Sequence, residues 1–131
     1  MMSVGFVGLG HMGGNMATRL HSAGYEVYGN EREREHARAL EEAGLRWRDT
    51  PREVAEAAEI VLTSLPDDEA LESAASGPNG ILAGLAADKV WVDVSTVSPR
   101  VSRELAERAS AVLHCWMRRC PGASRRCSRE R

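Results

Sequence analysis

The stretch that decides the fold is Ser3–Leu20, which reads SVGFVGLGHMGGNMATRL. It begins with a short, nearly continuous apolar run, Ser3 to Val7, which is typical of a strand buried on both faces of a parallel sheet. Apolar residues then recur at every fourth position, as in a helix that packs one face onto that sheet: Met12, Met16 and Leu20. The stretch therefore predicts a strand, a tight turn and a helix.

Three glycines join these two elements at the spacing G-x-G-x-x-G: Gly8, Gly10 and Gly13. Between a strand and a helix this spacing is the fingerprint of a dinucleotide-binding turn. Gly8 allows the sharp turn, Gly10 lets the backbone approach a pyrophosphate, and Gly13 lets the helix pack closely on the strand. The N–H groups at the start of the helix would then face the phosphates. The alternative is a glycine-rich turn without a ligand.

Length and composition indicate one domain whose C-terminal end differs in charge from the rest of the chain. The chain has 131 residues and a net charge of −2, but residues 1–115 hold 11 basic and 18 acidic residues, whereas the last sixteen hold six arginines and one glutamate. Cys115, Cys120 and Cys127 also lie at this end, with spacings that predict neither a zinc site nor a disulfide scaffold. Since no long apolar span or signal-peptide pattern is present, we expect a soluble, cytoplasmic protein.

Further along the chain, extended apolar segments alternate with helical ones. Strands are predicted at 25–29, 45–47, 60–65 and 90–94. Helices are predicted at 33–43, at 50–58 with a capping box that begins at Thr50, at 67–75 and at 98–112. This alternation predicts an α/β fold, a Rossmann-type doubly wound parallel sheet, over residues 1–112. Residues 113–131 are predicted to form an irregular, Arg- and Cys-rich tail.

Candidate site residues lie at the ends of four predicted strands. Ligands of such sheets bind outside the carboxyl ends of the strands, here Gly8–Gly13, Glu31–Arg32, Leu65–Pro66 and Ser95–Thr96. The Leu65–Pro66 pair offers an apolar wall, and Ser95–Thr96 offers hydroxyls beside a nicotinamide or, alternatively, a cap for the next helix. A helix N-terminus disfavours a protonated histidine, so His11 is interpreted as a loop residue.

Glu31 bears on the choice of dinucleotide. It lies about twenty residues beyond the glycine turn, where the fingerprint expects an acid that bonds the ribose hydroxyls. A carboxylate there would repel a 2′-phosphate by about 4 kcal/mol at 4 Å in a partly shielded site, which favours NAD. The neighbouring Arg32 could bind a 2′-phosphate, so NADP stays open. Alternatively, both residues belong to a solvated helix start, EREREH.

Three motifs in this order resemble the N-terminal domain of the β-hydroxyacid dehydrogenases, a family that includes 3-hydroxyisobutyrate and 6-phosphogluconate dehydrogenases: GFVGLGHMGGNMATRL, Leu65-Pro66 and DVSTVSP at 93–99. The resemblance covers residues 3–109 and implies hydride transfer between NAD or NADP and a small 3-hydroxy acid. Glu31 stands where the family usually has Asp or Asn. The cofactor-binding residues expected from the motifs are Gly8, Leu9, Gly10, His11, Met12, Gly13, Gly14, Glu31, Arg32, Leu65, Pro66 and Thr96, with Ser95 and Thr96 on the substrate side.

The chain departs from the family after these motifs. Family members continue into a substrate motif close to LDAPVSGG and then into a helical domain that supplies a catalytic lysine and a dimer interface. Here Cys115–Ala123 reads CWMRRCPGA, and the only lysine, Lys89, is not at the catalytic position. We therefore assign no catalytic residue and expect this chain to bind cofactor without turnover. A small hydroxy-acid substrate is expected only for a full-length form, which we expect to be a homo-oligomer. A non-catalytic dinucleotide-binding or sensing module is the alternative.

The arginine-rich tail has a further interpretation, as an arm that binds nucleic acid. The tail lacks a helical pattern and the rest of the chain is acidic, so we expect neither a nucleic-acid nor a membrane partner, and no metal site.

The tail also predicts a shifted reading frame. If the bases are regrouped from the third position of each codon, Cys115-Trp116 becomes Leu and Trp116-Met117 becomes Asp, whichever codons are used. The codons allowed for 118–123 then permit Ala, Pro, Val, Ser, Gly and Gly, which completes LDAPVSGG. We expect a one- or two-base slip shortly before Cys115, and a natural variable tail is the alternative. Sequencing the coding DNA tests this, and a shifted frame without that motif and an open helical domain would refute it.

Overall fold

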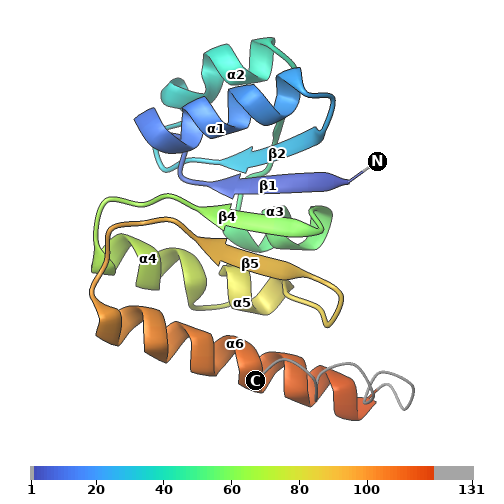
Figure 1. Ribbon diagram of the computed structural model, residues 1–131, viewed down its shortest axis with the longest axis vertical. Helices are drawn as coiled ribbons and strands as arrows, with labels where there is room; N and C mark the ends of the chain where they lie inside the picture. The colour runs from blue at the N-terminus through green and yellow to red at the C-terminus, as the bar shows by residue number, and fades with distance from the viewer. Residues whose placement is uncertain (1, 120–131) are drawn as a thin grey trace.

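The sheet has five parallel strands and lies between two layers of helices (Figure 1). This computed structural model describes residues 2–119. The strands are β1 (Ser3–Val7), β2 (Glu26–Asn30), β3 (Arg46–Trp47), β4 (Ile60–Thr63) and β5 (Val90–Asp93). Their order across the sheet is β3-β2-β1-β4-β5, so the chain starts in the middle and winds outward in both directions. The predicted doubly wound α/β fold is confirmed.

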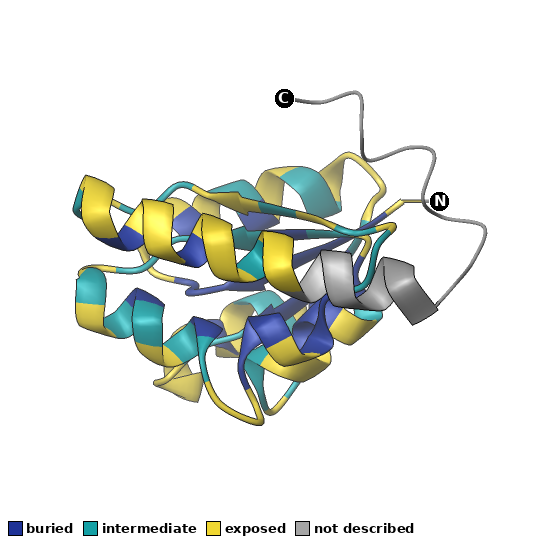
Figure 2. Ribbon diagram, turned by 90° about the horizontal axis from the view of Figure 1, so that it is seen from below, coloured by how far each residue is buried: buried dark blue, intermediate teal, exposed yellow. Residues whose placement is uncertain are grey.

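The helices divide between the two faces of the sheet. They are α1 (His11–Ser22), a 3-10 turn (Arg34–Ala37) that leads into α2 (Arg38–Glu42), α3 (Pro51–Ala57), α4 (Asp68–Ala75), α5 (Ile81–Gly84) and α6 (Pro99–Arg119). Residues of α1 share one core with Phe6 and Val27 of the strands. Residues of α3, α4, α5 and α6 share the other core with Val7 and Val61. The buried strands between the two layers are visible in Figure 2.

Two element boundaries differ from the sequence prediction. The segment predicted as one helix at 33–43 is a 3-10 turn followed by a short α-helix. The last helix runs to Arg119, beyond the predicted boundary at residue 112, because no glycine or proline interrupts the sequence before Pro121. The remainder of the predicted tail, 120–131, lies outside the described residues.

The inner face of α1 is narrower than the sequence pattern indicates. Gly13 and Ala17 are its buried residues, and Met16 and Leu20 pack at the edges of the same core. Met12 is 60% exposed, so its prediction as a core residue is wrong. The buried side of α1 is centred on the small residues Gly13 and Ala17, and Met12 lies about 100° around the helix from Gly13.

Helix caps in this fold follow the local sequence. The backbone N–H of Glu53 donates to the Thr50 hydroxyl at 3.2 Å, which caps α3 as predicted. The Glu53 carboxylate accepts from the N–H of Asp49 at 2.9 Å, one residue before the N–H of a standard capping box. Asp67 caps α4 in the same way, through the N–H of Ala70 at 2.8 Å.

The strand β5 forms an apolar edge of the sheet. Val90 is 53% and Val92 39% exposed, and a hollow of about 290 Å³ beside the strand is lined mainly by apolar side chains of the neighbouring helices. An exposed apolar edge strand promotes association and dye binding. Among the helices of residues 2–119, none has the length and apolar character needed to cross a membrane.

We expect the isolated chain to bind a hydrophobic dye and to associate as its concentration rises. Dye fluorescence and sedimentation velocity measure these effects. Val92→Lys places a charge on the edge and should reduce both. A monomer that binds no dye would contradict this prediction.

Candidate functional site

Two glycines of the turn after β1 are required by the fold itself. Gly8 has φ of +96°, a conformation that favours glycine, and a Cβ there would lie against the carbonyl oxygen of Ser64 and 3.0 Å from Leu65 Cδ2. A Cβ on Gly13 would lie against the carbonyl oxygen of Gly8. These contacts fit the predicted roles of Gly8 in the turn and of Gly13 in helix packing.

Gly10 is different because nothing in the fold requires it to be glycine. It is exposed, its φ of −68° and ψ of −161° suit any residue, and no described atom lies within 4 Å of where its Cβ would be. The space in front of the first turn of α1 is therefore open to a ligand that approaches the backbone.

The start of α1 presents unpaired donors to that space. Gly10, its N-cap residue, makes no side-chain cap, and its first turn holds no acidic residue. Within residues 2–119, the N–H groups of His11, Met12 and Gly13 have no acceptor. Unpaired N–H groups and the helix dipole together favour an anion at this position. By contrast, α3 and α4 have side-chain caps.

Glu31 lies against the glycine turn. The N–H of Leu9 donates to its Oε2 at 2.5 Å, a contact between the end of β2 and the turn after β1. A carboxylate has further lone pairs that can accept hydrogen bonds, so Glu31 can still accept from a ligand hydroxyl. Arg32, beside it, is exposed.

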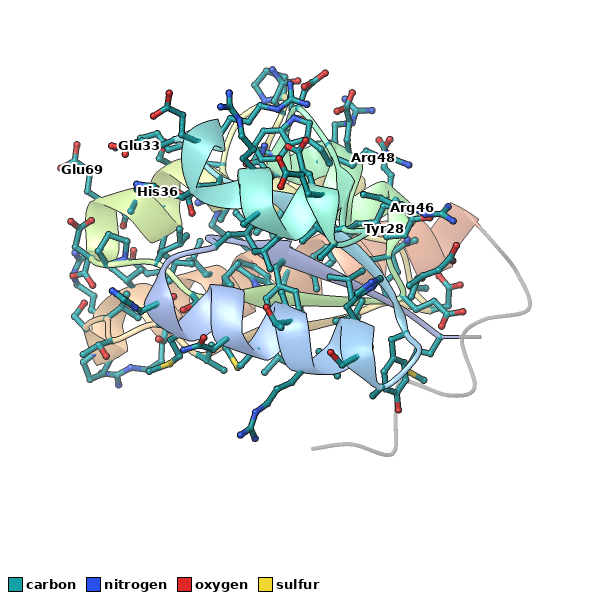
Figure 3. The ribbon with its side chains drawn as sticks, turned by 90° about the horizontal axis from the view of Figure 1, so that it is seen from above. Tyr28, Glu33, His36, Arg46, Arg48 and Glu69 are labelled. Atoms are coloured by element: carbon teal, nitrogen blue, oxygen red, sulfur yellow. The ribbon has the colours of Figure 1, made fainter. Side chains whose placement is uncertain are left out.

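Two cavities flank the turn at the carboxyl ends of the strands. The larger, of about 540 Å³, is lined by predicted residues from three strand ends: Gly8, Glu31, Arg32, Leu65 and Pro66. The other, of about 430 Å³, is lined by the predicted residues Leu9, Gly10, His11 and Gly14. Met12 and Gly13 lie in the intervening first turn of α1. His36, which lies 3.2 Å from the carboxylate of Glu33, borders both cavities (Figure 3).

The sequence analysis did not identify the contribution of α4 to the larger cavity. Ala70, Ser73 and Ala74 line it from this helix, whereas Leu71 and Ala75 are buried in the core. In the sequence, Ala70 and Ala74 are visible only as small residues at i and i+4, a pattern that is equally typical of core packing, and Ala74 does pack against the core. They leave room beside the Leu65–Pro66 pair.

Ser95 and Thr96 do not line either cavity. The Ser95 hydroxyl accepts from the N–H of Leu65 at 2.8 Å and lies 3.4 Å from the Thr63 carbonyl, to which it donates. Thr96 is exposed. The two adjacent residues therefore differ, since only the Ser95 hydroxyl is bonded to the end of β4.

Asp68 joins the start of α4 to the start of α6. Its Oδ1 accepts from the N–H of Ser98 at 2.7 Å, and hydrogen bonds from the Ser98 backbone and hydroxyl lower the pKa of this carboxyl. Because the pKa is lower in the folded chain, the interaction stabilises the fold above the unfolded-state pKa. The stabilisation is lost as the pH falls through the folded-state pKa.

Lys89 lies at the opposite end of the sheet from these cavities. Its Nζ donates to the carbonyl oxygens of Glu56 and Ala58, both at 2.8 Å, just before β4 and β5 begin. Its ammonium group is thus tied to the amino ends of the strands. Within the described residues, no cluster of His, Cys, Asp or Glu could hold a metal ion.

Comparison with solved structures finds the same fold in known proteins, one of them solved with NADP+. Psf3 in complex with NADP+ and 2-OPP has a TM-score of 0.78 at 29% identity, over 83% of this chain and 39% of that one. The 3-hydroxyisobutyrate dehydrogenase of Mycobacterium tuberculosis, with L-serine, has a TM-score of 0.76 at 28% identity, over 86% of this chain and 38% of that one.

Sequence comparison identifies the family. The 3-hydroxyisobutyrate dehydrogenase of Pseudomonas aeruginosa is 36% identical over 111 residues, which cover 85% of this chain and 37% of that protein. The human mitochondrial 3-hydroxyisobutyrate dehydrogenase is 38% identical over 87% of this chain and 34% of its own length. The chain thus spans about a third of these relatives. The family described as the NAD binding domain of 6-phosphogluconate dehydrogenase matches residues 3–117, and the chain belongs to this family.

Proposed function

We propose that the chain binds a nicotinamide dinucleotide across the carboxyl ends of β1, β2 and β4. The carrying observation is the start of α1, where unpaired N–H groups of the described chain border the open space at Gly10. The pyrophosphate would bind there and the adenosine ribose at Glu31. The adenine would occupy the larger cavity beside Leu65 and Pro66, and the nicotinamide would extend toward Thr96.

Titration with NADH and NADPH, followed by fluorescence and by calorimetry, tests this assignment. Saturable binding is expected. A chain that binds neither nucleotide would refute the proposal.

We propose further that NAD is preferred over NADP. Glu31 is held against the glycine turn by the N–H of Leu9, so its carboxylate would stand beside the ribose and repel a 2′-phosphate. Arg32 and the relative that carries NADP+ support the opposite preference. A preference for NAD and a preference for NADP can be distinguished by the change in NADPH affinity when the carboxylate of Glu31 is removed.

Glu31→Asn should therefore strengthen NADPH binding by about tenfold or more, which corresponds to roughly 1.4 kcal/mol, while NADH binding weakens. Calorimetric titration with both nucleotides measures the change. Glu35→Gln removes a carboxylate that lines neither cavity and is the matched control for net charge. An unchanged NADPH affinity in Glu31→Asn would count against Glu31 as the ribose ligand.

For the longer protein we propose hydride transfer between the nicotinamide and a small 3-hydroxy acid, by analogy with the 3-hydroxyisobutyrate dehydrogenases. The bound nicotinamide would supply or accept the hydride. Lys89 is tied to two carbonyl oxygens at the far end of the sheet, which supports the proposal that this chain alone holds the cofactor without turning over substrate. A cytoplasmic location and a homo-oligomeric full-length form remain proposals from the sequence.

A non-catalytic dinucleotide-binding or sensing module is the second candidate, and the placement of Lys89 favours it. The two functions differ in one measurement. Oxidation of 3-hydroxyisobutyrate with NAD+ by a form of the protein that includes the helical domain of the family would favour the enzyme. Cofactor binding without turnover by the complete protein would favour the module.

A further inference from the structure

A network of hydrogen bonds joins the ends of β4 and β5 below the proposed cofactor site. Thr63, which is fully buried, donates its hydroxyl to Asp93 Oδ1 at 2.8 Å and accepts from Trp91 Nε1 at 3.2 Å. The same Asp93 oxygen accepts from the backbone N–H of Ser95 at 3.0 Å. These three contacts hold the backbone of Ser95 in place after β5 ends.

The Ser95 side chain carries this network to the loop after β4. Its hydroxyl accepts from the N–H of Leu65 at 2.8 Å and donates to the Thr63 carbonyl at 3.4 Å. Leu65 and Pro66 are the residues of this loop that line the larger cavity. Within the described residues, the N–H of Leu65 therefore has one hydrogen-bond acceptor, the hydroxyl of Ser95, which lies thirty residues further along the chain.

We propose that Ser95 is a positioning residue for the dinucleotide, which acts by holding the Leu65–Pro66 wall of the cavity. This inference rests on the proposed cofactor site and replaces the expectation that Ser95 offers its hydroxyl to a substrate. Without the hydroxyl, the Leu65 N–H loses its acceptor and the loop can turn away from the cavity. A pre-positioned wall matters for affinity because ordering a loop on binding weakens the complex.

Ser95→Ala tests the proposal, with Ser98→Ala as the matched control. Ser98 lies in the same loop, and its hydroxyl accepts from the N–H of Val101 at 3.4 Å at the start of α6. Its alanine variant loses the hydrogen bond from the hydroxyl to Asp68 and keeps the one from the backbone N–H. Both variants lose one hydroxyl and some stability, but only Ser95→Ala releases Leu65. Ser95→Thr restores a hydroxyl at the original position.

Two readouts are needed, the Kd for NADH by calorimetry and the exchange rate of the Leu65 amide by NMR. We expect Ser95→Ala to raise both by about tenfold, Ser98→Ala to leave both within about twofold, and Ser95→Thr to return both toward the unmodified values. Thermal unfolding of each variant shows that the measurements refer to folded chains.

The outcomes separate this inference from the function on which it rests. An unmodified chain that binds neither NADH nor NADPH would overturn the proposed function and the positioning role with it. Binding by the unmodified chain with unchanged affinity or unchanged Leu65 exchange in Ser95→Ala would overturn the positioning role alone. Equal weakening in the two alanine variants would also overturn it, because general destabilisation would then explain the effect.

Discussion

Gly10→Val should abolish dinucleotide binding and leave the fold intact. The backbone angles of Gly10 suit valine, and its Cβ meets no described atom within 4 Å. The branched side chain would instead occupy the space before the N–H groups of α1, where the pyrophosphate is proposed to bind. We expect NADH affinity to fall by about 100-fold or more, which corresponds to roughly 2.8 kcal/mol.

Calorimetry measures the loss of affinity, and thermal unfolding gives the control. The midpoint of unfolding should stay within about 2 °C of the unmodified chain, since a surface substitution away from special contacts changes stability little. Gly10→Val that still binds NADH with the original affinity would show that the phosphates do not bind at this turn.

Gly13→Val, by contrast, should destabilise the fold itself and not only weaken dinucleotide binding. Its Cβ would lie against the carbonyl oxygen of Gly8 and 3.3 Å from Ser64 Cβ, so neither the turn nor the segment directly after β4 can yield easily. Such overpacking costs roughly 3 kcal/mol or more, a large share of the about 5–15 kcal/mol that stabilises a domain. We expect a drop in the unfolding midpoint of roughly 10 °C or loss of soluble protein.

Circular dichroism during heating measures this effect, and Gly10→Val serves as the matched control because it makes the same substitution three residues away. Gly13→Val that unfolds at the original temperature would refute the close packing of α1 against the turn.

Local chemistry explains why the fold could be predicted from the sequence. Alternation of apolar runs with capped helical segments identified the parallel sheet, and Thr50 caps α3 as its sequence predicts. The exposed Met12 shows where periodicity fails. The stripe of large residues did not mark the core face of α1, because the buried residues of this helix are the small Gly13 and Ala17.

The lining of the candidate site could be predicted where it lies at strand ends, but not where it depends on residues far apart in the chain. The turn at Gly8–Gly10, Glu31 and Leu65 border the two cavities, as expected for the carboxyl ends of parallel strands. The bond between Ser95 and Leu65 joins residues thirty apart, and no local pattern encodes such a pair. Ala70 lines the larger cavity. The sequence alone does not show whether a small helix residue lines a cavity or packs in the core.

The three turn glycines have different surroundings and are therefore expected to evolve differently. If a lineage of this fold stopped using its nucleotide, Gly8 and Gly13 would still be retained by purifying selection, since each meets backbone atoms of its own chain. A Cβ on Gly10 would contact no described atom within 4 Å, so of the three only Gly10 could be replaced by other residues. The identity of that one residue would therefore separate paralogues that still use a dinucleotide from those that keep only the scaffold.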